Sequence, residues 1–109
     1  MSLSQIEYFV AVAEHGNVSR AADALRIAQP AISRQIQRLE DELGARLFVR
    51  KARGVHLSDA GAVFLTHARS VLREVDRAAL AVRGLSRGEM TSPSSRGNGT
   101  DRRDSSVSS

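Results

Sequence analysis

Hydrophobic residues recur at the 3.6-residue spacing of an α-helix in three successive segments of the chain. The pattern predicts helices at about residues 3–15, 18–25 and 29–43, each with one apolar face. We expect these faces to form the core through Leu3, Ile6, Phe9, Val10, Ala13, Val18, Ala21, Ala22, Leu25, Ile32, Ile36, Leu39 and Leu43.

The ends of these three helices carry recognisable signals. Gly16 is expected to end the first helix in a left-handed backbone conformation, and Asn17 to cap the second. Pro30 is tolerated only in a first turn and so marks the start of the third helix. Ala28 precedes it and cannot cap, at a cost of about 1 kcal/mol relative to Ser. Gly44 ends the third helix.

The pattern changes to an alternation at residues 45–57. Leu47 and Val49 alternate with polar residues, as do Val55 and Leu57, with the basic segment 51–54 between them. This predicts a two-stranded hairpin with a basic tip.

A long fourth helix is predicted to begin after Ser58, which is placed to cap it, with Asp59 in its first turn. About 27 residues would span roughly 40 Å, longer than so small a domain can cover. We therefore expect pairing with a partner helix. The alternative is that the first half packs on the domain and the second half frays. The proposed dimerisation stripe consists of Phe64, Ala68, Val71, Leu72, Val75, Ala79 and Val82.

Two helices joined by a tight break, with polar residues on the outer face of the second, are typical of a helix-turn-helix. That face carries Gln29, Ser33, Arg34, Gln37 and Arg38, whose side chains can hydrogen-bond base edges and phosphates. The hairpin would then be a wing. Arg53, beside Gly54, could reach the minor groove, or the wing tip could be a solvated basic turn.

Charge and composition support this interpretation. The net charge is only +4, but seven Lys and Arg residues lie between positions 26 and 53, where acidic residues are confined to positions 40–42. A basic surface of this kind suits phosphate, although it could also be simply solvated. The chain has no cysteine, and it shows no membrane-spanning run or leader, so we expect a cytoplasmic protein.

The composition also predicts the domain organisation. We expect a winged helix-turn-helix at 1–58, a linker and dimerisation helix at 59–88, and a disordered low-complexity tail at 89–109. In the tail, Val107 is the only large apolar residue after Met90, too little to offset chain entropy.

Enzymatic chemistry is not expected. His15, His56 and His67 are scattered without a second ligand at metal-binding spacing, and Ser58 and Asp59 are explained by helix capping. No glycine-rich phosphate loop occurs. We predict no catalytic residue, no metal and no cofactor.

Over about residues 3–85 the chain resembles the LysR-type bacterial transcriptional regulators. The matching motifs are Leu3 with Tyr8-Phe9, Ser-Arg-Ala-Ala at 19–22, Gln-Pro-Ala-Ile-Ser-Arg-Gln-Ile at 29–36, Leu-Glu-Asp-Glu-Leu-Gly at 39–44, Leu-Phe-Val-Arg at 47–50, Leu57-Ser58 and Ala60-Gly61.

The resemblance implies a mainly α fold, in which a winged helix-turn-helix is followed by a helix that pairs antiparallel with its copy. It further implies that the protein binds an interrupted dyad as a homodimer on double-stranded DNA. The DNA-contact residues carried over are Gln29, Pro30, Ser33 and Arg34 for bases, Gln35 and Arg38 (with Ser33) for phosphates, and Arg50, Lys51 and Arg53 on the wing.

After residue 90 the chain departs from the family pattern. Members continue into a two-lobed effector-binding domain, whereas here a Ser- and Gly-rich segment follows, so we expect no small-molecule effector. An excised domain, a frameshifted gene and a genuine short protein all fit. Two functions stay open: a sequence-specific DNA-binding domain, and a dimerisation module that pairs with and inhibits a full-length relative.

Overall fold

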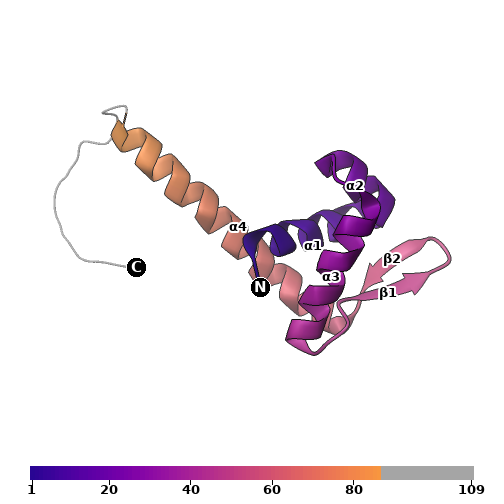
Figure 1. The fold of residues 1–109 in the computed structure, drawn as a ribbon. Coiled ribbons are helices and arrows are strands. Elements are labelled where there is room, and N and C mark those ends of the chain that lie inside the picture. The colour runs from indigo at the N-terminus through magenta and orange to yellow at the C-terminus, as the bar shows by residue number, and fades with distance from the viewer. Residues whose placement is uncertain (87–109) are drawn as a thin grey trace. The chain divides into compact units, whose positions relative to one another are not determined.

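The computed structural model describes residues 1–86 (Figure 1). The predicted tail at 89–109 lies outside the described residues. The element order is α1 (Leu3–His15), α2 (Val18–Leu25), α3 (Gln29–Leu43), β1 (Phe48–Lys51), β2 (Gly54–Leu57) and α4 (Asp59–Ser86). Contacts divide the chain into one unit at Met1–Arg73 and a second that begins at Glu74. The mainly α, winged helix-turn-helix prediction is confirmed.

The helix boundaries follow from local capping chemistry. The Ser2 hydroxyl accepts the Gln5 backbone N–H, and the Gln5 side chain accepts the Ser2 N–H, which closes a capping box on α1. Gly16 ends α1 with φ 66°, and the Asn17 side chain accepts the Arg20 N–H at 2.9 Å. These predicted boundaries are confirmed.

The turn between α2 and α3 is held by two backbone hydrogen bonds. The Ile27 N–H donates to the Ala22 carbonyl at 3.0 Å, and the Arg26 N–H donates to the Asp23 carbonyl at 3.2 Å. This is a Schellman pattern, in which the left-handed position is usually glycine. Here Arg26 occupies it with φ 58°, the one positive φ of a non-glycine residue among those described. The tight turn between α2 and α3 therefore forms without the glycine that normally marks such a turn in a sequence.

The core lies where α1, α2 and α3 cross, and β1 and the start of α4 close it. Phe9 is its centre: its ring lies 5.2 Å from that of Phe48 and 5.1 Å from that of Phe64, centroid to centroid. Two sequence predictions are wrong, because Leu3 and Leu43 are 48% and 37% exposed. Leu3 is the first residue of α1 and Leu43 the last of α3, and neither packs against the core. The fully or nearly buried apolar residues are Ile6, Phe9, Val10, Val12, Ala21, Ala22, Ile32, Ile36, Leu39, Leu47 and Ala68.

The predicted hairpin is present as an antiparallel pair, with Lys51 opposite Gly54 at the tip. Its expected inward alternation is only partly right. Leu47, just before β1, is buried, but Val49 is 43% exposed and Phe48 turns inward to Phe9 instead. Within β1 only Phe48 is half-buried, and the rest of the strand is exposed because nothing in the described part of the chain covers it.

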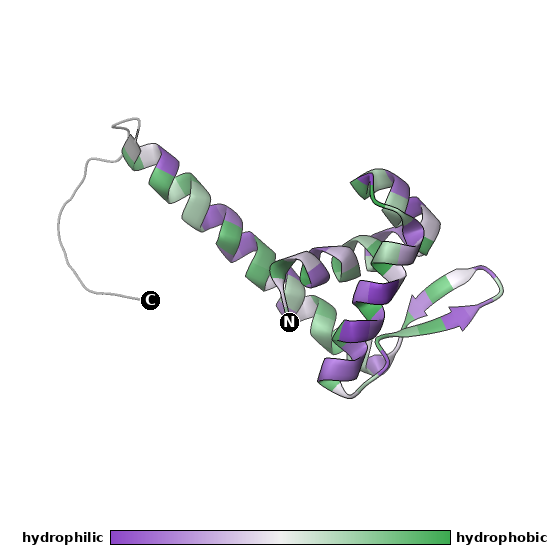
Figure 2. Ribbon diagram, in the orientation of Figure 1, coloured by the Kyte–Doolittle hydropathy of each residue, from purple (hydrophilic) through white to green (hydrophobic). Residues whose placement is uncertain are grey.

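α4 is continuous over 28 residues and begins, as predicted, at a Ser58 cap whose hydroxyl accepts the Gly61 N–H at 2.9 Å. Hydrophobic residues recur along it (Figure 2). Ala68 is 1% exposed, and Phe64 packs edge-on against Phe9, so both contribute to the chain's own core. Ala68 therefore has almost no exposed surface left for a dimer interface, whereas Phe64 is half-buried and stays a predicted dimer contact. The first compact unit also extends past residue 58, to Arg73, because this part of α4 packs on it.

Candidate nucleic-acid interface

The outer face of α3 is polar and open to solvent. Ile32, Ile36 and Leu39 turn inward and are buried. Around the rest of the helix, most of the predicted contact residues are exposed. Gln29, Pro30, Arg34 and Arg38 are exposed, and Ser33 and Gln35 are half-buried.

Two glutamines of α3 already have partners within the chain. The Ser19 hydroxyl donates to Oε1 of Gln29 at 2.9 Å, which joins the first turns of α2 and α3. Nε2 of Gln5 donates to Oε1 of Gln35 at 3.0 Å, which joins α1 to α3. Gln35 therefore helps to hold α3 on the domain, whatever it also contacts outside.

The hairpin is anchored at its base by Glu40 of α3. Oε2 of Glu40 accepts the Leu47 N–H at 2.7 Å and the Phe48 N–H at 3.4 Å. Buried or half-buried backbone N–H groups need such partners, and a charged acceptor makes a strong hydrogen bond. Glu40 thus connects α3 directly to the start of β1.

A second anchor lies nearer the tip, against the end of α1. The Val55 N–H donates to the Gly16 carbonyl at 3.1 Å. A Cβ on Gly54 would lie 2.4 Å from the same carbonyl oxygen, and Gly54 has φ 103°. Only glycine allows this close approach, so the hairpin is held against the turn between α1 and α2.

These anchors bring the hairpin beside α3 and create two hollows. The larger has apolar walls that include Val12 and Phe48 and is bordered by Ser33 and Arg50. The other is lined by Ser19, Gln29, Arg50 and Lys51, among others. Arg50 borders both, so the structure brings the predicted contacts of the α3 start and of the hairpin together.

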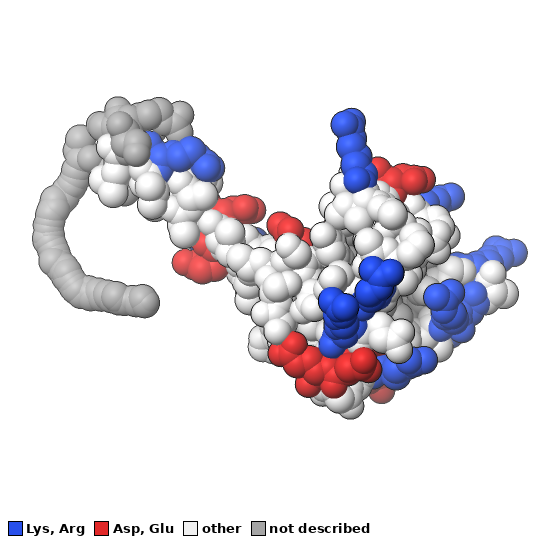
Figure 3. Space-filling model, viewed as in Figure 1, with Lys and Arg blue, Asp and Glu red and all other residues white. Residues whose placement is uncertain are grey.

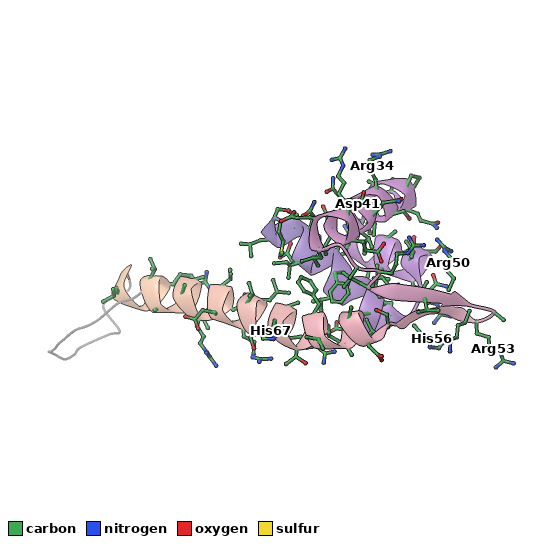
Figure 4. All side chains as sticks on the ribbon, turned by 90° about the horizontal axis from the view of Figure 1, so that it is seen from below. Arg34, Asp41, Arg50, Arg53, His56 and His67 are labelled. Atoms are coloured by element: carbon green, nitrogen blue, oxygen red, sulfur yellow. The ribbon has the colours of Figure 1, made fainter. Side chains whose placement is uncertain are left out.

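Arg53 is placed differently from Arg50. It lies at the hairpin tip, and it lines a separate hollow with His15 and His56 (Figure 4). Arg50 and His56 point to opposite sides of the hairpin in the same view. The three wing cations therefore do not form a single cluster.

Positive charge gathers over α3 and the hairpin, while acidic residues gather at the far end of α3 (Figure 3). Within residues 1–86, the ion pairs join Arg69 to Glu14, Arg77 to Glu74 and the N-terminal amine to Glu42. None of them involves a cation of α3 or the hairpin. Those charges remain available for phosphate, which binds through neutralisation by Lys and Arg.

The structure adds residues to this surface that the sequence did not single out. Arg46, in the loop before β1, borders the larger hollow with Gln37. Ser19 reaches Gln29 only because α2 and α3 cross at their first turns. The sequence assigned no DNA contact to Arg46 or Ser19, since each reaches this surface through contacts between separate elements.

The geometry is that of known DNA-binding domains. Residues 3–62 match the family model described as a bacterial regulatory helix-turn-helix protein of the lysR family. The chain belongs to the LysR family. Among its curated relatives, TfdT of Cupriavidus pinatubonensis is 49% identical over 82% of this chain. The nitrogen assimilation regulatory protein nac of Escherichia coli is 44% identical over 78%.

Solved structures of LysR-family DNA-binding domains have the same architecture. The CbnR DNA-binding domain in complex with DNA superposes with a TM-score of 0.74 at 43% identity, covering 79% of this chain and 99% of that one. The BenM DNA-binding domain on benA site 1 DNA gives 0.74 at 42% identity, covering 78% and 99%. The described chain is thus a DNA-binding domain of a LysR-type transcriptional regulator, and the predicted class of function is confirmed.

The chain spans only part of its full-length relatives: 39% of TfdT and 28% of nac. Within residues 1–86, no group of His, Asp and Glu is arranged to hold a metal ion. Over that same range, no helix has the length and apolar character needed to cross a membrane.

Proposed function

We propose that the chain binds an interrupted dyad in double-stranded DNA as a homodimer, with α3 in the major groove and the hairpin as a basic wing. The observation that carries the proposal is that Arg50 of the hairpin lines both hollows, one with Ser33 of α3 and the other with Gln29 of α3. Side chains of the α3 start and Arg50 of the hairpin meet there on one exposed surface. A groove-bound helix with a flanking basic strand can contact bases and backbone together.

The residues divide into base contacts and backbone contacts. Gln29, Pro30, Ser33 and Arg34 would read bases, because Gln pairs with adenine, Arg with guanine, and an apolar side chain with the thymine methyl. Phosphate contacts would come from Ser33, Gln35, Arg38, Arg50 and Lys51. Arg53, at the tip, would enter the minor groove, where negative potential favours Arg.

Dimerisation is proposed to use the apolar side chains of α4 that the chain leaves exposed. Val71, Val75 and Val82 are 39%, 42% and 62% exposed, and Phe64, Leu72 and Ala79 of the same stripe are half-buried. They recur at helical spacing, so a second copy of the helix could cover them. Following the family resemblance, we propose antiparallel pairing.

Selection from randomised duplex DNA tests the proposal. The purified chain is incubated with the pool at about 0.15 M salt, where weak electrostatic binding is suppressed. Enrichment of an interrupted dyad is the expected result, and the bound species should contain two copies of the chain. Enrichment of a single half-site would contradict the dimer, and enrichment of nothing would contradict autonomous specificity.

A second candidate function is pairing with a full-length relative and inhibiting it. It is favoured by the exposed apolar residues of α4, which the corresponding helix of a relative could cover. Mixing the chain with a full-length regulator of the family should then give heterodimers that mass photometry resolves. Strict self-pairing would remove this candidate. Either function belongs in the cytoplasm, where bacterial DNA lies.

A further inference from the structure

The first turns of α2 and α3 meet through two polar side chains. The Ser19 hydroxyl donates to Oε1 of Gln29 at 2.9 Å. Both residues are exposed, and both line the hollow that Arg50 and Lys51 border. The contact therefore lies within the surface proposed to face DNA and not in the core.

We propose that Ser19 is a positioning residue for Gln29, and that its hydroxyl sets the base preference at the position that Gln29 reads. The proposal rests on the proposed function, in which Gln29 contacts a base. Ser19 itself need not touch DNA for this role.

The physical reason lies in the symmetry of the carboxamide. Its oxygen accepts and its NH₂ donates, yet the two ends have nearly the same shape, so a half-turn of the group exchanges them. An exposed Gln without a partner can present either order to a base edge. In the structure the Ser19 hydroxyl donates to Oε1, which holds the carboxamide with its oxygen toward α2 and its NH₂ away from α2.

In that orientation the Gln29 carboxamide still has one acceptor and one donor for a base edge. A carbonyl oxygen has two lone pairs, so Oε1 of Gln29 can accept from Ser19 and from a base at once. Oε1 would take the N6 amino group of adenine while Nε2 donates to N7, the bidentate pairing that distinguishes adenine in the major groove. Ordering the side chain before binding also lowers the entropy lost on binding. The expected base is therefore adenine.

The test compares base preferences on the duplex enriched from the randomised pool. The informative base pair is the one whose preference Gln29→Ala abolishes. Ser19→Ala should reduce discrimination at that pair by about twofold to tenfold, the contribution of one hydrogen bond, and leave the other positions unchanged. Ser19→Thr keeps the hydroxyl and should restore the preference. Thermal melting followed by circular dichroism checks that each variant is folded.

A double mutant separates positioning from direct contact. In a Gln29→Ala background, Ser19→Ala should have no further effect on base preference. A uniform loss of affinity for all sequences, persisting in that background, would mean that Ser19 binds phosphate directly and would overturn the proposal. If Gln29→Ala changes no base preference, the proposed base contact of Gln29 is wrong. That result differs from failure of the Ser19 proposal alone, in which Gln29→Ala changes a base preference and Ser19→Ala does not.

Discussion

Arg34 and Arg50 carry the same charge in different surroundings. Arg34 is exposed on α3 and points away from the domain (Figure 4). Arg50 is exposed on β1 and lines both of the hollows that the hairpin shares with α3. A helix side chain in the major groove can grip a guanine edge through two hydrogen bonds, whereas a strand beside it runs along the backbone. The two residues should therefore have separable effects.

Replacing Arg34 by Ala should relax base preference at one position in each half-site. The expected cost is about 1–3 kcal/mol on the preferred sequence and less on sequences with another base there. Binding measured by fluorescence anisotropy against single-base variants of the selected duplex checks this. Arg73→Ala removes the same charge from α4 and serves as the control. Equal losses on all sequences would show that Arg34 contacts only the backbone.

Replacing Arg50 by Ala should weaken binding to all sequences alike. Each phosphate contact contributes about one unit to the slope of log K against log salt, so the slope should flatten by about one. Titrations over a range of salt concentrations measure it. An unchanged slope with altered base preference would instead assign Arg50 to a base.

The position of the hairpin is set by hydrogen bonds to residues outside it. Glu40 holds its base, and the Gly16 carbonyl holds Val55 near its tip. A two-stranded hairpin by itself is marginally stable in water. Its position beside α3 therefore depends on one carboxylate and one close backbone contact more than on its own sequence.

Replacing Glu40 by Ala should lower the free energy of unfolding by about 1–3 kcal/mol, because the Leu47 and Phe48 N–H groups lose their acceptor. Urea denaturation measures this. Asp41→Ala, at the exposed neighbouring position, removes an equal charge and should have little effect on stability. Equal, small changes in both variants would mean that water replaces the Glu40 carboxylate without loss.

Several large apolar side chains of α4 are exposed to solvent. Val75, Leu80, Val82 and Leu85 are each more than two-fifths exposed, at 42%, 58%, 62% and 64%. A dimer would cover part of this surface. It would also link two DNA-binding domains, so that once one has bound its half-site, binding of the other becomes effectively intramolecular.

Replacing Val71 and Val75 together by Asp should give monomers, because two charges would be buried without partners in the interface. Sedimentation equilibrium checks the mass. Affinity for the full dyad should fall by about a hundredfold or more, while affinity for a half-site is retained. Thr66→Asp with Ser70→Asp adds the same charges at exposed polar positions of α4 and should leave the dimer intact. A persistent dimer in the Val71 and Val75 variant would move the interface elsewhere.

The helices, their caps and the class of function can be predicted from local patterns along the chain. Gly16, Asn17, Pro30 and Ser58 act on their own neighbours along the chain, so their effects can be read without knowing the fold. The exposed polar face of α3 follows from the same 3.6-residue period that buries Ile32 and Ile36 on its other side, at positions read from the sequence.

Which apolar and polar residues have partners depends on how the elements pack together. Ala68 shares the stripe of Val75, but it lies where α4 packs on the core, so almost none of its surface is exposed. The contact between Ser19 and Gln29 likewise exists because two helices cross. A residue's period shows which face of its element it occupies. What covers that face depends on contacts between residues far apart in the chain, and local patterns do not encode them.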